Sequence, residues 1–252
     1  MPFVLFSLHG DHFWLPNSAT MRPMNMQQLT DNIAKVRSRV RESAQKCQRE
    51  ESTVSLLAVS KTRSAGDVRN AAACGLRRFG ENYLQEAVGK IEALQDLDLE
   101  WHFIGPIQSN KTRLIATHFD WVHSVDREKI ARRLNEQRPE ALPPLNICLQ
   151  VNISAEDSKS GVVPDALGEL VEAISKMTRL RLRGLMAIPA ATGDADQQRA
   201  NFAQLRQLLP QVQQQVPEAD TLSMGMSGDM EAAIAEGATI VRIGTDLFGP
   251  RG

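Results

Sequence analysis

The sequence lacks the features that would point to a disulfide-bonded, metal-binding or nucleic-acid-binding protein. Its 252 residues include only three cysteines, Cys47, Cys74 and Cys148, with no C-x-x-C pair and no zinc-like spacing to the five histidines. So few cysteines, odd in number, indicate a reducing compartment, and we expect a cytoplasmic protein. The formal net charge of -1 gives no positive field for nucleic acid or anionic lipid, so the expected partners are small molecules or proteins.

Long hydrophobic runs are also missing. The apolar stretch near the N-terminus extends only from Phe3 to Leu8, and no Lys or Arg precedes it. It is therefore too short and wrongly flanked for a signal peptide or a membrane span. Because recognisable periodicity starts only after this segment, we predict a poorly ordered extension over residues 1–23 and a single folded domain over residues 24–252.

What the chain does contain is an apolar fraction of 42%, arranged in alternating strand-like and helix-like segments. From Leu29 to Cys47, apolar residues recur at steps of three and four, which predicts an additional amphipathic helix before the first strand. Residues 54–61, VSLLAVSK, form a short apolar run without alternation, which is typical of a strand buried on both faces.

Eight strand-like segments follow one another along the chain. They occupy residues 54–61, 77–82, 100–105, 120–125, 145–153, 180–188, 221–227 and 238–244. Eight strands alternating with helices in a chain of this length favour an α/β fold of the (β/α)8, TIM-barrel type over an open doubly wound sheet. No G-x-G-x-x-G or G-x-x-x-x-G-K motif follows any strand, which weakens a dinucleotide- or nucleotide-binding interpretation.

Local signals predict where several helices begin or change direction. Ser109, and either Ser124 or Asp126, are placed to cap the helices after the third and fourth strands. Pro164 suits a first helical position. Pro210 is expected to kink or restart the helix after the sixth strand.

Lys61 stands at the C-terminal end of the first strand, where a barrel of this type carries its active site. Burial disfavours an ammonium ion, so it would lower the pKa of the lysine and make its amine a nucleophile able to form a Schiff base. A surface lysine whose stem covers apolar neighbours is the alternative. Which of these two interpretations of Lys61 is favoured depends on the residues at the ends of the other strands.

Polar residues gather at the ends of the seventh and eighth strands, where barrels commonly hold phosphate. Ser227 is placed to cap a helix, whose N-terminal N–H groups favour an anion. Gly244 would let a ligand approach the backbone, and Thr245 adds a hydroxyl. The carboxylate of Asp229 would repel a close anion, so a phosphate must contact the cap itself. An ordinary capping serine and a loop glycine are the alternative.

A lysine and a phosphate site, on opposite sides of the cofactor ring, are what pyridoxal phosphate requires. The sequence also contains AVSKT at 58–62, FGENYLQE at 79–86, WHFIGPIQSNK at 101–111, GLMAI at 184–188, SMGMSGDMEAAI at 223–234 and VRIGTDLFGPR at 241–251. In these segments it resembles the pyridoxal phosphate homeostasis proteins, single-barrel relatives of the N-terminal domain of alanine racemase. The resemblance extends over about residues 26–251.

The resemblance implies a cofactor, pyridoxal 5'-phosphate, and the residues that bind it. These are Lys61, Asn82, Ser227, Arg242, Gly244 and Thr245. The lysine would hold the cofactor as an aldimine, Ser227, Gly244 and Thr245 would contact its phosphate, and Asn82 would lie near it. The implied function is intracellular homeostasis of this cofactor, by storage or by delivery to apo-enzymes.

Arg242, which the resemblance sets against the pyridine nitrogen, also has a physical interpretation of its own. It shares one face of the eighth strand with Ile240 and Gly244, and an arginine inside a barrel needs an acceptor. A guanidinium stays protonated, so it would donate to the pyridine nitrogen, keep that nitrogen unprotonated and weaken the ring as an electron sink. Transamination and decarboxylation are thereby disfavoured. The alternative is a salt bridge to a carboxylate such as Glu81.

Three functions remain to be weighed. A cofactor carrier that is not an enzyme is favoured. An amino-acid racemase of alanine-racemase type needs proton-transfer groups on both faces of Cα, whereas Lys61 serves one face and the only tyrosine, Tyr83, stands in a different motif. The barrel also accounts for the folded sequence and leaves no second domain. A plain scaffold leaves the lysine and phosphate residues unexplained. We expect a monomer, with weak dimerisation as the alternative.

The remaining polar and sulfur-containing candidates are given structural roles. His102 and His123 fall inside predicted strands, and we interpret them as hydrogen-bonded core or rim residues, since no partner spacing supports a metal site. Met186, Met224 and Met226 are expected to pack around the cofactor ring or in the core.

Overall fold

The computed structural model describes residues 25–154 and 160–250. The predicted extension over residues 1–23 lies outside these ranges, so the division into an extension and one domain stays a prediction. Within the described ranges, no helix is both long and apolar enough to cross a bilayer. The same residues contain no group of three or more His, Cys, Asp or Glu side chains placed to hold a metal ion.

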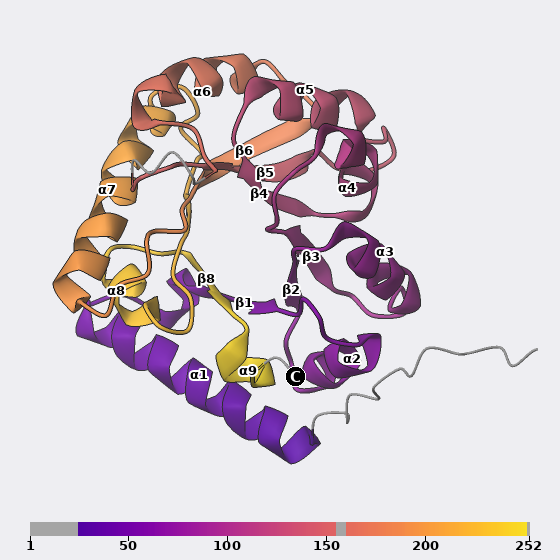
Figure 1. The fold of residues 1–252 in the computed structure, drawn as a ribbon, viewed down its shortest axis with the longest axis vertical. Coiled ribbons are helices and arrows are strands. Elements are labelled where there is room, and N and C mark those ends of the chain that lie inside the picture. The colour runs from indigo at the N-terminus through magenta and orange to yellow at the C-terminus, as the bar shows by residue number, and fades with distance from the viewer. Residues whose placement is uncertain (1–24, 155–159, 251–252) are drawn as a thin grey trace, which may run out of the picture.

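Eight parallel strands close into a barrel, each paired with the next, and β8 paired back to β1 (Figure 1). The strands are β1 Ser55–Val59, β2 Arg78–Glu81, β3 Glu100–Phe103, β4 Trp121–Val125, β5 Leu145–Gln150, β6 Leu180–Met186, β7 Thr221–Ser223 and β8 Ile240–Ile243. All eight predicted strands and the (β/α)8 barrel are confirmed. Most strands end earlier than predicted, because the chain leaves the ladder and enters the loops that form the barrel mouth.

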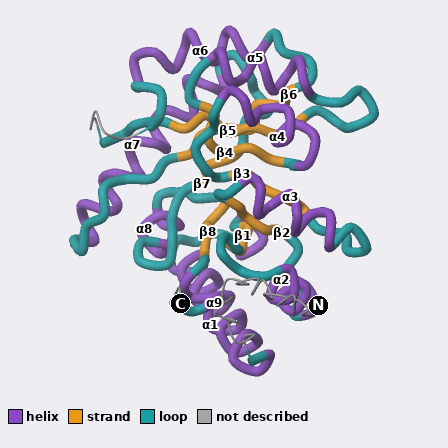
Figure 2. Tube along the Cα trace, turned by 45° about the vertical axis from the view of Figure 1, so that its right-hand side comes forward, coloured by secondary structure: helices purple, strands orange, loops and turns teal. Residues whose placement is uncertain are grey.

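Helices surround the barrel wall (Figure 2). They are α1 Met26–Lys46, α2 Ala65–Ala73, α3 Leu84–Ala93, α4 Thr112–His118, α5 Glu128–Gln137, α6 Leu167–Ser175, α7 Ala195–Gln213, α8 Met230–Ala235 and α9 Thr245–Phe248. Three short 3-10 turns accompany them, η1 Glu51–Thr53, η2 Ser109–Lys111 and η3 Pro164–Ala166. This is the alternation of strands and helices that the sequence predicts.

The additional helix α1 covers the C-terminal elements of the chain. The side chain of Asn25 caps it by accepting a hydrogen bond from Gln27 N at 2.9 Å. Its buried stripe includes Leu29, Ile33 and Val36 at the predicted steps of three and four. Through this face α1 packs against α8 and α9, so the first helix of the chain supports the last two (Figure 1).

The barrel wall separates two sets of apolar side chains. The larger set fills the space between the strands and the helices. The smaller set consists of Leu57, Trp121, Cys148, Met186 and Ile240, each from a different strand, with the partly buried Ile104 packed against them. Polar residues fill the rest of the interior, as the next section describes.

The predicted helix caps after β3 and β4 are wrong. Ser109 starts the 3-10 turn η2, and α4 begins only at Thr112. The helix α5 has Arg127 at its N-cap and no side-chain cap hydrogen bond, so neither Ser124 nor Asp126 caps it. The hydroxyl of Ser124 instead donates to a backbone carbonyl inside the fold, which removes it from capping.

The two prolines behave differently from each other. Pro164 starts η3, so its prediction as a first helical position is confirmed, although the first turn is 3-10. Pro210 lies inside α7, which continues past it to Gln213 without restarting. Because proline has no N–H, the carbonyl of Arg206, four residues earlier, loses its helical donor.

Candidate functional site

The carboxyl ends of the strands bring three predicted site residues together on one rim of the barrel. Lys61 follows β1, Asn82 follows β2, and Gly244 follows β8. Because β1 pairs with both β2 and β8, these positions are neighbours. A Cβ added to Gly244 would lie 3.4 Å from Val59 Cβ, so the end of β8 closely approaches β1 here.

Lys61 stands half-buried in a turn that its neighbours hold in place. Ser60 N donates to Gly80 O at 3.0 Å, which continues the β1–β2 pairing to the residue before the lysine. Thr62, the residue after it, has a φ of +64°, an uncommon left-handed conformation for a β-branched residue. Its N–H donates to Glu86 Oε1 at 2.7 Å. The lysine is therefore carried by a constrained turn.

A buried ion-pair network lies between this turn and α3. The Nζ of Lys90 donates to Ser60 O at 2.7 Å and pairs with Glu81 Oε1 at 2.7 Å and with Glu86 Oε1 at 2.6 Å. Glu81 also accepts from Ser60 Oγ at 2.6 Å. Burial raises the pKa of Glu81, although Lys90 and Ser60 both favour its charged form. The network ties α3 to the turn that carries Lys61.

Arg242 lies inside the barrel, with only 4% of its surface exposed. Its Nη1 donates to Ser223 O at 2.5 Å and to Ser223 Oγ at 2.8 Å, and its Nη2 donates to Ala187 O at 2.9 Å. Burial lowers the pKa of the guanidinium to about 10, so the group stays protonated at neutral pH. These bonds do not use all the N–H groups of a guanidinium, and part of its donor set remains for a ligand.

The alternative partner for Arg242, a salt bridge to Glu81, is wrong. Glu81 pairs with Lys90 of α3 and accepts from Ser60, on the outer side of the barrel wall. Arg242 instead finds its acceptors in backbone carbonyls and a serine hydroxyl within the barrel. All three hydrogen bonds of this buried cation therefore go to neutral acceptors.

Asn82 has an acceptor that the fold does not use. Its Oδ1 is buried and has no hydrogen-bond partner among the described residues. The loop after β3 approaches the backbone of Asn82 closely, since a Cβ added to Gly105 would lie 2.4 Å from Asn82 O. Buried amide oxygens are normally paired, so an unpaired one beside the predicted lysine is suited to a ligand that donates a hydrogen bond.

Ser227 lies in the turn after β7, but its predicted role as a helix cap is wrong. The N-cap of α8 is Asp229, whose carboxylate accepts from Met226 N at 2.6 Å. The hydroxyl of Ser227 is therefore not used to cap the helix, while its carbonyl accepts from Arg39 Nη2 of α1 at 3.1 Å. A capping residue could not be identified from the sequence here, because Ser and Asp compete for the same position.

The loop after β7 also needs glycine. Gly225 has a φ of +93°, and a Cβ added to it would lie 2.5 Å from Ala233 Cβ. Its carbonyl accepts from Arg242 N at 2.9 Å, which joins this loop to β8. The short helix α9 begins at Thr245, directly after Gly244. The two loops that follow β7 and β8 therefore lie next to each other, as the prediction of a joint phosphate site requires.

The interpretation of His102 and His123 as hydrogen-bonded core residues is confirmed, and their partners form a chain that the sequence does not predict. His102 Nε2 lies 2.9 Å from Glu100 Oε1, and His102 Nδ1 lies 2.8 Å from His123 Nε2. His123 Nδ1 lies 2.7 Å from Ser223 Oγ, which accepts from Arg242. We call these five residues the buried polar chain. Only Glu100 and His102 stand at alternate positions of one strand, and the other three residues lie on three different strands, so the sequence gives little sign of these contacts.

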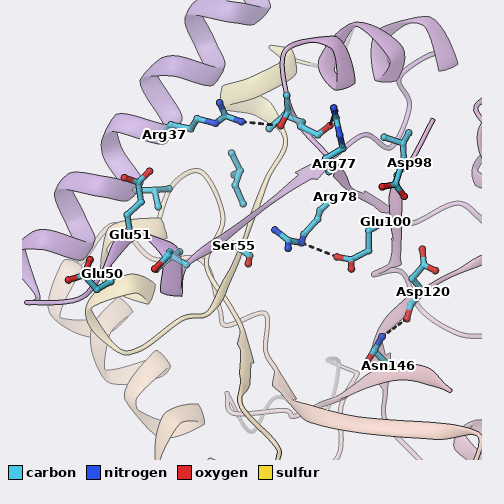
Figure 3. A pocket seen from close by; sticks show the side chains of 17 residues that line it. Arg37, Glu50, Glu51, Ser55, Arg77, Arg78, Asp98, Glu100, Asp120 and Asn146 are labelled. Carbon is cyan, nitrogen blue, oxygen red and sulfur yellow. Dashed lines mark hydrogen bonds and ion pairs between the residues drawn. The ribbon is translucent and has the colours of Figure 1, made fainter. Parts of the chain in front are cut away.

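A cavity of about 1110 Å3 lies at the other end of the barrel, where the strands begin (Figure 3). Charged residues line it, among them Glu51, Arg78, Glu100 and Asp120. The guanidinium of Arg78 donates to Glu100 Oε1 at 2.9 Å. None of the predicted site residues contributes to this amino-end cavity, so the predicted chemistry and this hollow are at opposite ends of the barrel.

The two buried histidines predict a pH dependence of stability. Burial lowers the pKa of both His102 and His123, so below the unfolded value of about 6.5 the unfolded chain binds protons that the folded chain does not. The free energy of unfolding is therefore unaffected by these histidines above that pH. Below it, the free energy of unfolding falls as the pH drops, by up to about 2.7 kcal/mol per pH unit for two histidines. Urea denaturation between pH 5 and 8 measures this slope.

The controls for this slope use single histidine variants. His102→Gln and His123→Gln should each flatten it. Comparing each variant with the wild type cancels the contribution of the carboxylates. A wild-type urea midpoint that does not change with pH over this range would contradict the prediction.

Comparisons with known proteins agree with the fold and with the family resemblance. The family model "Alanine racemase, N-terminal domain" matches residues 24–252. The pyridoxal phosphate homeostasis protein of Pseudomonas aeruginosa is 63% identical over 226 residues, covering 90% of this chain and 97% of that protein. The protein of the same name from Escherichia coli is 52% identical over 229 residues, covering 90% and 98% respectively.

Solved structures extend the comparison. The structure of PipY from Synechococcus elongatus with PLP bound is 41% identical and has a TM-score of 0.76, covering 88% of this chain and all of PipY (100%). Alanine racemase from Corynebacterium glutamicum, at 14% identity and a TM-score of 0.66, shares the fold alone; this chain covers 61% of that protein. The chain therefore belongs to the family of pyridoxal phosphate homeostasis proteins, whose barrel is that of the N-terminal domain of alanine racemase.

Proposed function

We propose that this protein binds pyridoxal 5'-phosphate through a Schiff base at Lys61 and keeps it for storage or for delivery to apo-enzymes, without turnover of its own. The names of the relatives and the cofactor bound to PipY support this role. The structural observation that carries the proposal is Arg242, a buried guanidinium with unused N–H donors. It lies on β8, which pairs with β1, the strand that Lys61 follows.

The residues present fit the cofactor. The unpaired Oδ1 of Asn82 suits the hydroxyl of the cofactor ring, and the spare donors of Arg242 suit its ring nitrogen. Ser227, Gly244 and Thr245 offer hydroxyl and backbone N–H donors for the phosphate. A bound cofactor would supply an aldehyde, and Lys61 would be the residue whose amine holds it covalently.

Arg242 also supports a carrier over an enzyme. An arginine with a pKa of about 10 remains a donor at neutral pH, so it leaves the ring nitrogen unprotonated. An unprotonated ring is a poor electron sink, and the carbanions of transamination and decarboxylation are poorly stabilised on it. Holding and releasing the cofactor does not need such stabilisation.

The racemase alternative is less well supported. Racemisation needs a proton-transfer group on each face of the substrate carbon, and the only tyrosine of the sequence, Tyr83, is 52% exposed at the start of α3. The likeness to alanine racemase concerns the fold, which hosts different functions in different proteins.

Location and assembly belong to the same proposal. The thiols of Cys47, Cys74 and Cys148 are free, which supports a cytoplasmic location. We propose a monomer that meets its recipient apo-enzymes transiently, since a carrier must give up its cargo at the barrel mouth.

The experiment that tests this function is cofactor transfer. The loaded protein, freed of unbound cofactor, is incubated with the apo-form of a pyridoxal-phosphate-dependent aminotransferase, and recovery of aminotransferase activity is followed. We expect recovery to match the amount of cofactor supplied. Protein whose Schiff base has been reduced with borohydride is the matched control and should give no recovery, because the reduced link cannot be exchanged.

Two results would contradict the proposal. Failure of the unreduced protein to restore any aminotransferase activity would rule out delivery. Formation of D-amino acids from single L-amino acids at catalytic turnover would rule out a carrier without activity and favour the racemase.

A further inference from the structure

The buried polar chain crosses the barrel from one end to the other. Glu100 begins β3 and lines the amino-end cavity, whereas Arg242 lies near the carboxyl end of β8. His102, His123 and Ser223 stand between them and are 0% exposed. Apolar side chains line the rest of the interior, so each polar group depends on its neighbours in the chain for its hydrogen bonds.

The charge states along the chain follow from burial. The pKa of His102 is lowered by burial, although Glu100 opposes this, and that of His123 is lowered by burial and by the nearby Arg242. Both imidazoles are therefore neutral at pH 7. The hydrogen bond from His102 lowers the pKa of Glu100 to about 2, so this carboxyl is ionised. Three charged residues outside the buried polar chain act on its two ends. Arg78 and Asp120 lie near Glu100 and His102, and Asp229 lies near Arg242.

The ionised carboxylate fixes the direction of the histidine hydrogen bonds. Glu100 can only accept, so His102 must carry its proton on Nε2. In a neutral imidazole the other nitrogen, Nδ1, is then an acceptor, and His123 must donate to it from Nε2. His123 Nδ1 is in turn left as an acceptor for the hydroxyl of Ser223. Each link determines the next one.

The direction of these hydrogen bonds also determines how Arg242, the last residue of the buried polar chain, is bonded. Because the Ser223 hydroxyl gives its proton to His123, its oxygen is free to accept from Arg242 Nη1. Every donor in the chain therefore points from the guanidinium towards Glu100. Together with the carbonyls of Ser223 and Ala187, this acceptor fixes the rotation of the guanidinium about its stem.

We infer that His102, His123 and Ser223 are positioning residues for Arg242: a one-way hydrogen-bond chain anchored at Glu100 orients the guanidinium and aims its remaining N–H donors at the ring nitrogen of the cofactor. The cofactor end of this inference rests on the proposed function. Its consequence is that an acidic residue at the amino end of the barrel affects a ligand held at the carboxyl end.

The first test concerns the cofactor-free protein. Nitrogen-15 NMR of the imidazoles distinguishes the two neutral tautomers, and we expect His102 and His123 both to carry the proton on Nε2 at neutral pH. In Glu100→Met, which removes the anchor at a 39% exposed side chain, this preference should be lost at His102. A proton on Nδ1 of either histidine in the wild type would overturn the inference, whatever the cofactor does.

The second test uses the protein loaded with pyridoxal phosphate. Ser223→Ala should lose the cofactor on dialysis about tenfold faster than the wild type, as expected when a bond to a charged group is removed. The remote Glu100→Met should lose it about threefold to tenfold faster. Both should shift the pH at which the visible band changes, because a misaligned Arg242 no longer keeps the ring nitrogen unprotonated. Glu100→Gln, whose carbonyl oxygen can still accept from His102 but whose amide can also donate, should fall between Glu100→Met and the wild type.

The matched control is Glu51→Met, which removes another carboxylate of the amino-end cavity outside the chain. It should behave like the wild type. If Glu100→Met and Ser223→Ala load normally but show wild-type retention and an unshifted band, the inference is wrong and the proposed function stands. If the wild type forms no Schiff base at all, the proposed function fails and the cofactor end of the inference fails with it.

Discussion

Lys61→Ala should abolish the yellow colour that the wild-type protein takes up on incubation with pyridoxal phosphate. The visible band belongs to the Schiff base, and without an amine in the turn after β1 no such bond can form there. Lys61→Arg should be equally colourless, since a guanidinium keeps the charge but is not a nucleophile. Absorption spectra after removal of free cofactor measure the effect, which should be a loss of the whole band.

Surface lysines also react with the aldehyde, so the control must separate them. Lys176, which pairs with Glu172 on the surface, offers a matched variant, and Lys176→Ala should keep the full band. Reduction with borohydride followed by peptide mapping should find the adduct on the peptide that contains Lys61. An adduct spread evenly over several lysines, or a Lys61→Ala protein that stays yellow, would refute the assignment.

Lys90→Met should destabilise the protein by about 3–5 kcal/mol, because it leaves the carboxylate of Glu81 buried without its cation. Glu81 is 0% exposed and loses its ion pair, and Ser60 O loses its donor. Urea denaturation at neutral pH measures the change in the free energy of unfolding. A loss below about 1 kcal/mol would contradict this account of the network.

A double variant shows where that loss comes from. Glu81→Gln combined with Lys90→Met removes both charges, and it should recover most of the stability, since a neutral amide is cheaper to bury than an unpaired carboxylate. Lys176→Met breaks an exposed ion pair and should cost less than about 0.5 kcal/mol. If the double variant is less stable than Lys90→Met, the unpaired carboxylate of Glu81 is not the source of the loss.

The barrel could be predicted because its determinants are local. Short apolar runs alternate with helical stripes, and each period is visible within a window of about ten residues. Helix starts were less predictable: at Ser109, Ser124 and Ser227 a capping side chain was expected, but the structure uses other residues or none. Several polar residues near a helix start can cap it, and tertiary hydrogen bonds decide among them.

The site divides in the same way. Lys61 and Arg242 stand out because a charged residue in or beside a buried strand is unusual, and that can be seen in one segment. The link from His123 to Ser223 joins residues 100 positions apart and has no local signal. The pairing of Glu81 with Lys90 likewise depends on how α3 packs on β2, so the sequence left Glu81 open as a partner for Arg242.

Closure of the β-barrel has a consequence for how the protein folds during synthesis. β1 pairs with β8, and Leu57 lies opposite Arg242, although almost the whole folded chain separates them. Contacts between such distant segments form late, because the chain between them must be ordered first. During synthesis, a ribosome-bound chain that has completed β1 but not β8 therefore presents Lys61 without Arg242. Only the finished barrel brings the nucleophile and the guanidinium together.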